Sequence, residues 1–270
     1  MPEMPPFEQL IRMEIVHRVR GMDAVSVERN RTYASPGGEP LAMDVYRPGG
    51  APAGRHPLVL LVHGGPIPKL GAKNMGVFTS YGRLLAASGL VGVAFDHRFL
   101  APDRLPDAAD DVAAALAHVR EQADDLGIDR DRVAVWVFSG GGPLLSLALK
   151  GAPAHVRAIV AFYAALDIRE KAPGASPSIT DDMRREFSPA HHVRAEKGRT
   201  APILVARAGL DHPFMNASID RFVSEALAAN AEIDVMNHPR GRHGFDFLDD
   251  DARSREIIAR TVEFLKARLR

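Results

Sequence analysis

The chain has 270 residues, 46% of them hydrophobic and 25% charged, which is enough apolar sequence for the core of one large α/β domain over residues 1–270. Basic and acidic residues are equal at 34 each, so the charge balance favours neither nucleic acid nor an anionic membrane as a partner. We therefore expect a small, uncharged substrate. The absence of cysteine excludes disulfides and thiolate metal sites.

The amino-terminal residues lack the basic start and the apolar stretch of a signal peptide. Every apolar run is also shorter than the roughly 20 residues that a membrane span requires. We expect a soluble, cytoplasmic protein that binds no membrane.

The first elements precede the main sheet. Apolar residues recur near helical spacing from Phe7 to Val19, which predicts an amphipathic amino-terminal helix within residues 1–23. We interpret it as a helix laid over the domain, with a lid over an active site or a dimer contact as the alternatives. The alternating segments Ala24–Glu28 and Leu41–Tyr46 predict two strands that open the sheet in antiparallel fashion.

Strands then alternate with helices. The continuous apolar run Pro57–Val62 is typical of a strand buried on both faces, and it ends in His63-Gly64-Gly65-Pro66. A helix from Tyr81, a strand over Leu90–Phe95 and a long helix over Pro106–Leu126 follow. This alternation predicts a parallel sheet with right-handed crossovers.

The strand from Val133 stops abruptly at Ser139, and three glycines precede a helix-like segment from Pro143. Such a sharp turn from strand to helix lifts a serine hydroxyl clear of the sheet, as in a nucleophile elbow. Val137 stands where that motif usually has its first glycine. By itself the pattern fits an ordinary turn equally well. We predict that the Val137 methyls find space against Gly141 and Gly142.

The remaining chain supplies three more strands, over Val156–Phe162, Ala201–Arg207 and Ile233–Met236, and about eight strands in all. Residues 168–200 interrupt the rhythm with prolines and charges, and we interpret them as a short cap-like insertion over the site. The pair His191-His192 lies in this segment without a carboxylate at ligand spacing, so we expect surface histidines and no metal. An amphipathic helix over Ser254–Leu269 ends the chain.

Four of these junctions occur together in a characteristic order. A strand leads to His63-Gly-Gly, a second to Ser139-Gly-Gly-Gly, a third to Asp211 and the last to His243-Gly-Phe. In this order of Ser, Asp and His, the sequence resembles the α/β-hydrolases, and within them the small serine esterase and dienelactone-hydrolase-like branch, from about residue 25 onward. Dienelactone hydrolases use a cysteine nucleophile, which this chain lacks, so the resemblance implies a serine esterase without a cofactor.

The resemblance also implies roles for these residues. Ser139 would be the nucleophile, His243 its general base, and Asp211 would orient the histidine. Gly64 or Gly65, together with Gly140, would donate backbone N–H groups to an oxyanion, whereas His63 would brace the loop.

Alternatives remain for two of the roles. His238 is a second candidate base, and Asp167 a second candidate acid. We interpret His212 and Asp246 as solvated loop residues. Side chains that we expect at the substrate-binding end of the sheet are Ile67, Phe99, Leu100 and Phe214.

The function classes left open are a prolyl-oligopeptidase-like peptidase, a thioesterase and a non-catalytic ligand-binding relative. The peptidase class carries a large upstream propeller, whereas here some fifty residues precede the first buried strand. The non-catalytic class usually lacks one of the three catalytic residues. The expected partner is therefore a small ester, and a homodimer remains an open alternative.

Overall fold

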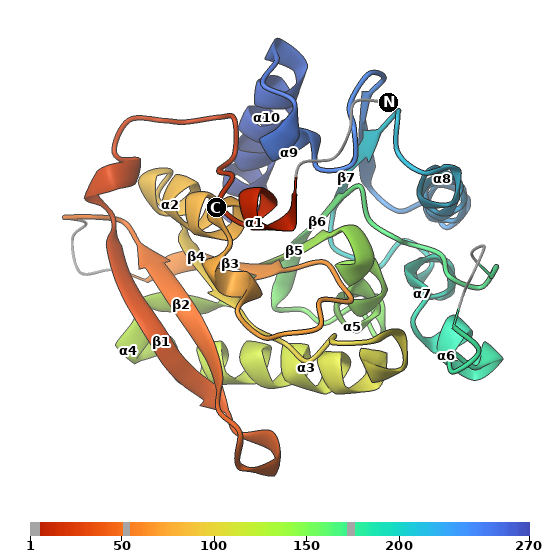
Figure 1. The fold of residues 1–270 in the computed structure, drawn as a ribbon, viewed down its shortest axis with the longest axis horizontal. Helices are drawn as coiled ribbons and strands as arrows, with labels where there is room; N and C mark the ends of the chain where they lie inside the picture. The colour runs from red at the N-terminus through yellow and green to blue at the C-terminus, as the bar shows by residue number, and fades with distance from the viewer. Residues whose placement is uncertain (1–5, 51–54, 172–175) are drawn as a thin grey trace.

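The computed structural model describes residues 6–50, 55–171 and 176–270, and it is built around a single eight-stranded sheet (Figure 1). The strands lie in the order β1-β2-β4-β3-β5-β6-β7-β8. The pairs β1–β2 and β2–β4 are antiparallel and all the others are parallel. This confirms the predicted α/β fold with its antiparallel opening. The strands are β1 Ser26–Ala34, β2 Leu41–Arg47, β3 His56–Val62, β4 Val91–Phe95, β5 Ile128–Phe138, β6 Val156–Phe162, β7 Ile203–Ala208 and β8 Ile233–His238.

Helices cover both faces of the sheet. On one face lie α2 (Gly76–Ala87) and α10 (Ala252–Arg268). The opposite face is covered by these helices: α3 Leu105–Glu121, α4 Ala123–Leu126, α5 Ser146–Leu149, α7 Pro189–Glu196 and α8 Pro213–Ala228. The described short elements are α1 Phe7–Leu10, α6 Asp181–Glu186, α9 Phe245–Leu248, η1 Met22–Ala24, η2 Pro36–Gly38, η3 Ala72–Asn74, η4 Pro102–Arg104 and η5 Ser139–Leu145.

The sheet separates two apolar cores, and β5 contributes to both of them. Val133, Val135 and Val137 belong to the core under α3 and α5, whereas Ala134, Trp136 and Phe138 belong to the core under α2 and α10. Successive side chains of a strand point to opposite faces, so a strand covered on both sides must be apolar at every position. The continuous apolar runs of the sequence reflect this requirement.

The predicted amino-terminal helix over Phe7–Val19 is wrong. Helix occurs only at α1, and the chain then runs irregularly to η1. The Ile15 N–H donates to the Ser80 hydroxyl at 3.1 Å, and the Val16 N–H donates to the carbonyl of Asp246 at 2.8 Å. Backbone groups that bond to other elements cannot form a helical ladder, so tertiary contacts override the helical spacing here. The prediction placed this helix within residues 1–23, of which residues 1–5 lie outside the described residues.

The junction between β5 and η5 is as sharp as its glycines predict. A Cβ added at Gly141 would meet the carbonyl of His63, and one added at Gly142 would meet the backbone of Ala165. Val137 is fully buried in the core with Leu144 and Leu145, but it is not among the nearest neighbours of those two glycines. The prediction that the valine methyls fill their space is therefore not supported. Because Gly141 and Gly142 have no side chains, the backbone segments that follow β3 and β6 can pack closely against them.

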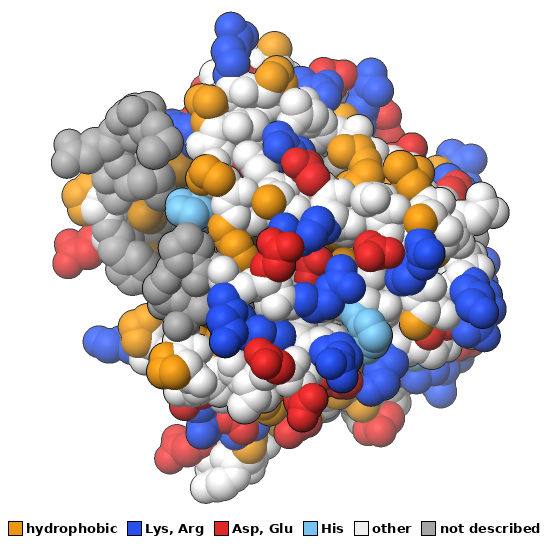
Figure 2. Space-filling model, turned by 90° about the vertical axis from the view of Figure 1, so that its right-hand side faces the viewer, with side chains coloured by type: hydrophobic (Ala, Val, Ile, Leu, Met, Phe, Trp, Pro, Cys, Tyr) orange, Lys and Arg blue, Asp and Glu red, His pale blue; other side chains and the backbone are white. Residues whose placement is uncertain are grey.

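The described part of the predicted insertion forms α6 and α7 (Figure 1). Helix α7 packs against α8 and α5 at the side of the molecule. Figure 2 shows this side directly, with Lys and Arg side chains interspersed among Asp and Glu side chains. No described residue of the segment lines the cavity at Ser139, so its described part does not form the cap that we expected. Residues 172–175 of it lie outside the described residues.

Candidate active site

Ser139, His243 and Asp211 lie together and form a continuous hydrogen-bonded chain. The Ser139 Oγ lies 2.7 Å from His243 Nε2, and His243 Nδ1 lies 2.7 Å from an Asp211 carboxylate oxygen. The Asp211 side chain is only 3% exposed, whereas the His243 side chain is 35% exposed. The histidine can therefore reach a bound molecule while the carboxylate behind it stays shielded from water.

Three different loops supply these residues, all at the carboxyl ends of parallel strands. Ser139 follows β5 directly, Asp211 lies between β7 and α8, and His243 lies between β8 and α9. Neighbouring parallel strands end at the same edge of a sheet, which brings residues distant in sequence together. Ser139 has a φ of 52°, in the left-handed region that serine rarely adopts. Such a strained conformation is characteristic of a nucleophile elbow.

The alternative base, His238, has a different environment. Its side chain is 2% exposed, and its Nε2 lies 3.1 Å from the Ser254 hydroxyl and 3.2 Å from a carboxylate oxygen of Asp251. These two residues begin helix α10. His238 therefore ties the end of β8 to that helix.

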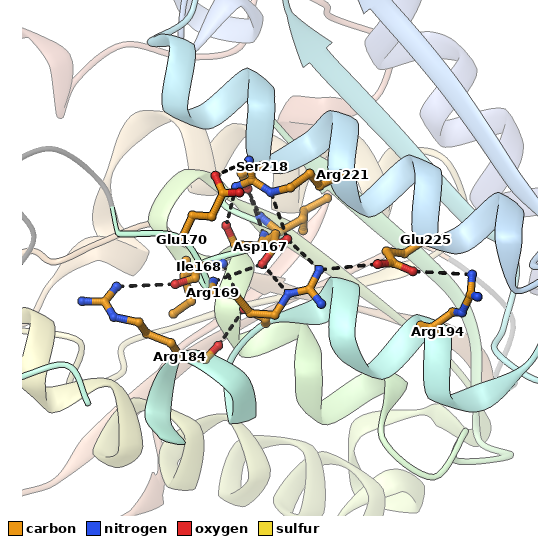
Figure 3. Close-up of polar contacts among 11 residues, drawn as sticks. Asp167, Ile168, Arg169, Glu170, Arg184, Arg194, Ser218, Arg221 and Glu225 are labelled. Carbon is orange, nitrogen blue, oxygen red and sulfur yellow. Dashed lines mark hydrogen bonds and ion pairs between the residues drawn. The ribbon is translucent and has the colours of Figure 1, made fainter. Parts of the chain in front are cut away.

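The alternative acid, Asp167, is the centre of an ionic cluster (Figure 3). One carboxylate oxygen accepts from Arg169 at 2.9 Å and from Arg221 at 3.0 Å, and the Asp167 N–H donates to the Ser218 hydroxyl at 2.9 Å. Burial raises the pKa of the Asp167 carboxyl group, but the hydrogen bonds from Arg169 and Arg221 outweigh burial and hold the pKa below its ordinary value. Asp167 therefore joins the end of β6 to α8.

Asp246 is not the solvated loop residue that we expected. It is fully buried, and its two carboxylate oxygens accept hydrogen bonds from Tyr81 and Tyr163, each at 2.7 Å. Burial raises the pKa of its carboxyl group to about 6. His212, by contrast, is exposed as expected, and its ring accepts from the N–H of Phe214 at the start of α8.

The His-Gly-Gly loop after β3 lies directly against the serine. A Cβ at Gly64 would stand 2.9 Å from the Ser139 Cβ, and one at Gly140 would collide with the carbonyl of Gly65. Within the described chain, the N–H groups of Gly64 and Gly65 donate no hydrogen bond to a protein group. Gly140 is the second residue of η5, so its N–H has no partner within that helix. Three backbone donors are thus available near the hydroxyl.

His63 lies beneath this loop. Its Nδ1 is 2.6 Å from the carbonyl of Gly64, and its ring stacks on His97 with centroids 3.5 Å apart. Burial lowers the pKa of the His63 ring to about 4, so the ring is neutral at physiological pH. These contacts agree with a bracing role.

A cavity of about 270 Å³ opens beside Ser139 and His243. Of the side chains expected there, Ile67 lines it, but Phe99, Leu100 and Phe214 do not. Phe99 lies under the loop instead, because a Cβ at Gly65 would meet its ring at 2.5 Å. The apolar lining comes mostly from side chains that the sequence did not single out: Met75, Val77, Phe78, Phe138, Tyr163 and Phe247. Phe138 and Tyr163 carried a signal, because they lie at the carboxyl ends of β5 and β6, at the same edge of the sheet as Ser139.

A second cavity, of about 450 Å³, shares Ile67 and Met75 with the first. Its other walls come from Ile11 and Arg12 and from the loop over residues 67–74. Two backbone N–H groups of that loop, from Gly71 and Lys73, donate to the Asp96 carboxylate. The loop is therefore anchored to the end of β4.

Residues 6–50, 55–171 and 176–270 contain no cluster of three or more His, Asp or Glu side chains that could hold a metal ion. None of the described helices combines the length and the apolar character needed to cross a lipid bilayer.

The sheet order, the elbow at Ser139 and the order of the three loops define the α/β-hydrolase fold. The BD-FAE family model matches residues 43–212, and the chain belongs to that family. The matched range includes Ser139 and Asp211 and ends before His243.

Two curated relatives are similar in sequence. Esterase LipC of Mycobacterium tuberculosis is 26% identical over 233 residues, which is 77% of this chain and 57% of that protein. The AB hydrolase superfamily protein C1039.03 of Schizosaccharomyces pombe is 31% identical over 146 residues, which is 53% of this chain and 41% of that protein. The chain thus spans about half the length of the curated relatives it matches.

Solved structures share the fold. Esterase 2 of Thermogutta terrifontis superposes with a TM-score of 0.73 at 20% identity, covering 91% of this chain and 93% of that one. A bacterial heroin esterase superposes with a TM-score of 0.76 at 20% identity, covering 92% of this chain and 86% of that one. The family and these structures agree with the predicted α/β-hydrolase, whereas the dienelactone-hydrolase-like branch stays a prediction.

Proposed function

We propose that this protein is a serine hydrolase that cleaves carboxylic esters through an acyl-enzyme intermediate. The observation that carries the proposal is the hydrogen-bonded chain from Ser139 through His243 to Asp211. The sequence similarity to Esterase LipC and the fold shared with solved esterases support an ester as the substrate.

In the first half-reaction, His243 Nε2 takes the proton of the Ser139 hydroxyl as its oxygen attacks the ester carbonyl carbon. Asp211, hydrogen-bonded to Nδ1, keeps the ring in the tautomer that presents an unprotonated Nε2 and stabilises the imidazolium that forms. The imidazolium then gives its proton to the departing alkoxide, so that an alcohol leaves and Ser139 is acylated. A water molecule activated by His243 reverses these steps and releases the acid.

Negative charge develops on the carbonyl oxygen during both half-reactions. The N–H of Gly140 and an N–H of Gly64 or Gly65 supply the hydrogen bonds that stabilise it. Backbone donors held in place by the fold stabilise such charge without reorganising, and the loss of one donor typically costs about 100–1,000-fold in kcat.

The cavities indicate the kind of ester. The space of about 270 Å³ beside Ser139 suits a small group, and its lining is apolar apart from the reacting residues. The adjoining space of about 450 Å³ can receive a longer apolar group on the other side of the ester bond. A small uncharged ester with one extended apolar arm is the substrate class that we propose.

Labelling with a fluorophosphonate probe tests the nucleophile. The probe should modify the parent protein at Ser139, and Ser139→Ala should remain unlabelled and should not hydrolyse a short-chain nitrophenyl ester. A folded parent that resists the probe would refute the serine hydrolase assignment.

The base is tested by comparing two histidines. His243→Ala should reduce kcat about as much as Ser139→Ala does, because the members of a triad act as a unit. His238→Ala is the matched control and should keep turnover while losing thermal stability, because its ring bonds only to the start of α10. If His238→Ala lost turnover and His243→Ala kept it, His238 would be the general base instead. A panel that includes peptide amides separates an esterase from a peptidase.

A further inference from the structure

A buried polar cluster lies behind His243, and the proposed triad does not include it. We call Tyr81, Tyr163 and Asp246 the Asp246 cluster. Both phenol groups donate to the same carboxylate at 2.7 Å, Tyr81 from α2 and Tyr163 from the end of β6. The three side chains are almost completely shielded from water. The cluster therefore joins α2, α9 and the end of β6 at one carboxylate.

The cluster is in direct contact with the histidine. The ring of Tyr163 meets the ring of His243 edge-on, with centroids 4.7 Å apart. Gly244 has a φ of 79°, and this left-handed turn starts α9 so that Asp246, three residues after His243, points back into the core. Tyr163 bridges the two groups, because its ring packs on His243 while its hydroxyl binds Asp246. Burial raises the pKa of the Asp246 carboxyl group, and the positive charge of a protonated His243 acts in the opposite direction.

A buried carboxylate usually has a cationic partner, because an isolated charge is costly in a low-dielectric interior. Within the described residues, no Lys or Arg side chain forms an ion pair with Asp246, and its donors are the two neutral phenols. The positive charge that acts on it from the site is the imidazolium of His243. That cation is present only when the ring is protonated.

We infer that Asp246 is a positioning residue that acts through His243: its carboxylate stabilises the imidazolium formed when Ser139 attacks, in addition to the direct bond from Asp211. The catalytic consequence rests on the proposed function, whereas the electrostatic coupling of the two residues does not. This gives the network a role beyond packing.

His243 and Asp246 contact different sets of groups. His243 contacts Ser139 from η5, Asp211 from the loop after β7, and Tyr163. Asp246 contacts Tyr81 and Tyr163 through its carboxylate, and its carbonyl accepts from the N–H of Val16 in the amino-terminal segment. A change at Asp246 therefore reaches His243 as a loss of one nearby negative charge.

Asp246→Asn keeps the shape of the side chain and removes its charge. We expect kcat/KM at pH 8 to fall about tenfold, because the imidazolium of the transition state loses a stabilising charge. The acidic limb of the pH profile should also move to lower pH by about 0.5–1 unit, because the ring of the free enzyme becomes harder to protonate. A profile that is lower but not displaced would show a structural role only and would overturn the inference.

Two further variants distinguish an electrostatic effect on kcat/KM from a general folding defect. Tyr81→Phe removes a donor that favours the anion, from a residue that does not line the cavity. The carboxylate should then ionise only at higher pH, so the ratio of kcat/KM at pH 7 to that at pH 9 should fall about threefold or more. Asp111→Asn is the matched control, a buried carboxylate that binds Arg98 away from the cavity at Ser139. It should leave the acidic limb where it is.

An NMR titration separates this inference from the proposed function. The ring signals of His243, identified by their loss in His243→Gln, are followed against pH in the parent and in Asp246→Asn. The midpoint should move to lower pH in the variant whether or not the protein hydrolyses esters. An unmoved midpoint overturns the inference, whereas a moved midpoint in a protein without esterase activity overturns the proposed function alone.

Discussion

At the scale of single residues, His63 and His97 show how burial sets a protonation state. The Nδ1–H of His63 donates to the carbonyl of Gly64, and its Nε2 accepts from the N–H of His97 at 3.4 Å. Protonation of Nε2 would replace that acceptor with a second donor inside the core. Burial lowers the pKa of His63, and its hydrogen bond to the carbonyl of Gly64 only partly offsets this effect.

This predicts acid sensitivity of the fold. The pKa of His63 is about 4 in the folded protein and 6.5 as the ordinary value, so between these pH values the unfolded chain binds a proton that the folded chain does not. Its contribution to stability is complete above about pH 6.5, and about 3 kcal/mol is lost as the pH falls to about 4.

The measurement is urea unfolding of the parent and of His63→Gln at several pH values between 7 and 4.5. The free energy of unfolding should fall less steeply with acid in the variant. Asp246, whose pKa is raised to about 6, acts in the opposite direction below that pH, so the difference between the two proteins isolates His63. Parallel curves would contradict this account.

At the scale of elements, the site depends on two loops that can approach each other only without side chains. The loop after β3 and the start of η5 meet where a Cβ at Gly140 would collide with the carbonyl of Gly65. One loop carries the nucleophile and the other carries proposed oxyanion donors, so the packing of glycine backbone determines the geometry of both.

Gly140→Ala should push these loops apart. We expect kcat/KM to fall by about 100-fold or more, because the donors move away from the position of the oxyanion. Gly89→Ala provides a comparison, because a Cβ there meets open space and only the positive φ of 88° is unfavourable. That variant should lose about 1 kcal/mol of stability and retain its kinetics. Crystal structures and ester kinetics of both variants check the prediction, and an unimpaired Gly140→Ala enzyme would contradict it.

At the scale of the whole molecule, the two cavities share Ile67 and Met75 in their walls, and the larger one also borders the amino-terminal segment. Leu70 lies on the wall of the larger cavity and is 45% exposed. A large apolar side chain exposed at the rim of an apolar cavity is available to contact a bound apolar group.

Leu70→Asp should therefore alter selectivity. We expect kcat/KM for an ester with a long apolar arm to fall about tenfold relative to that for an acetate ester, because each buried CH₂ contributes about 0.8 kcal/mol. Leu227→Asp is the matched control, since Leu227 is 62% exposed on α8 and lines neither cavity. A kinetic panel of esters with increasing chain length measures the effect. Equal losses of kcat/KM for all esters of the panel would show that the larger cavity does not bind the substrate.

The sequence by itself determined the order of the strands along the chain, the carboxyl ends of β3, β4, β5 and β6, and the residue types at those ends. Continuous apolar runs predicted the strands buried on both faces, and the glycines after β3 and β5 marked the close approach of two loops. Ser139, Asp211 and His243 could be proposed because parallel strands present their carboxyl ends at one edge of the sheet.

Tertiary structure alone decided what each local pattern could not specify. Residues 7–19 have helical spacing, yet the N–H groups of Ile15 and Val16 bond to α2 and α9, which lie far away in the sequence. From the sequence we interpreted Asp246 as a solvated loop residue. Its burial could not be predicted there, because it depends on two tyrosines that come from α2 and from the end of β6. Local periodicity records which face of an element is apolar, whereas hydrogen-bond partners and the burial of a charge depend on contacts that form only when the whole chain has folded.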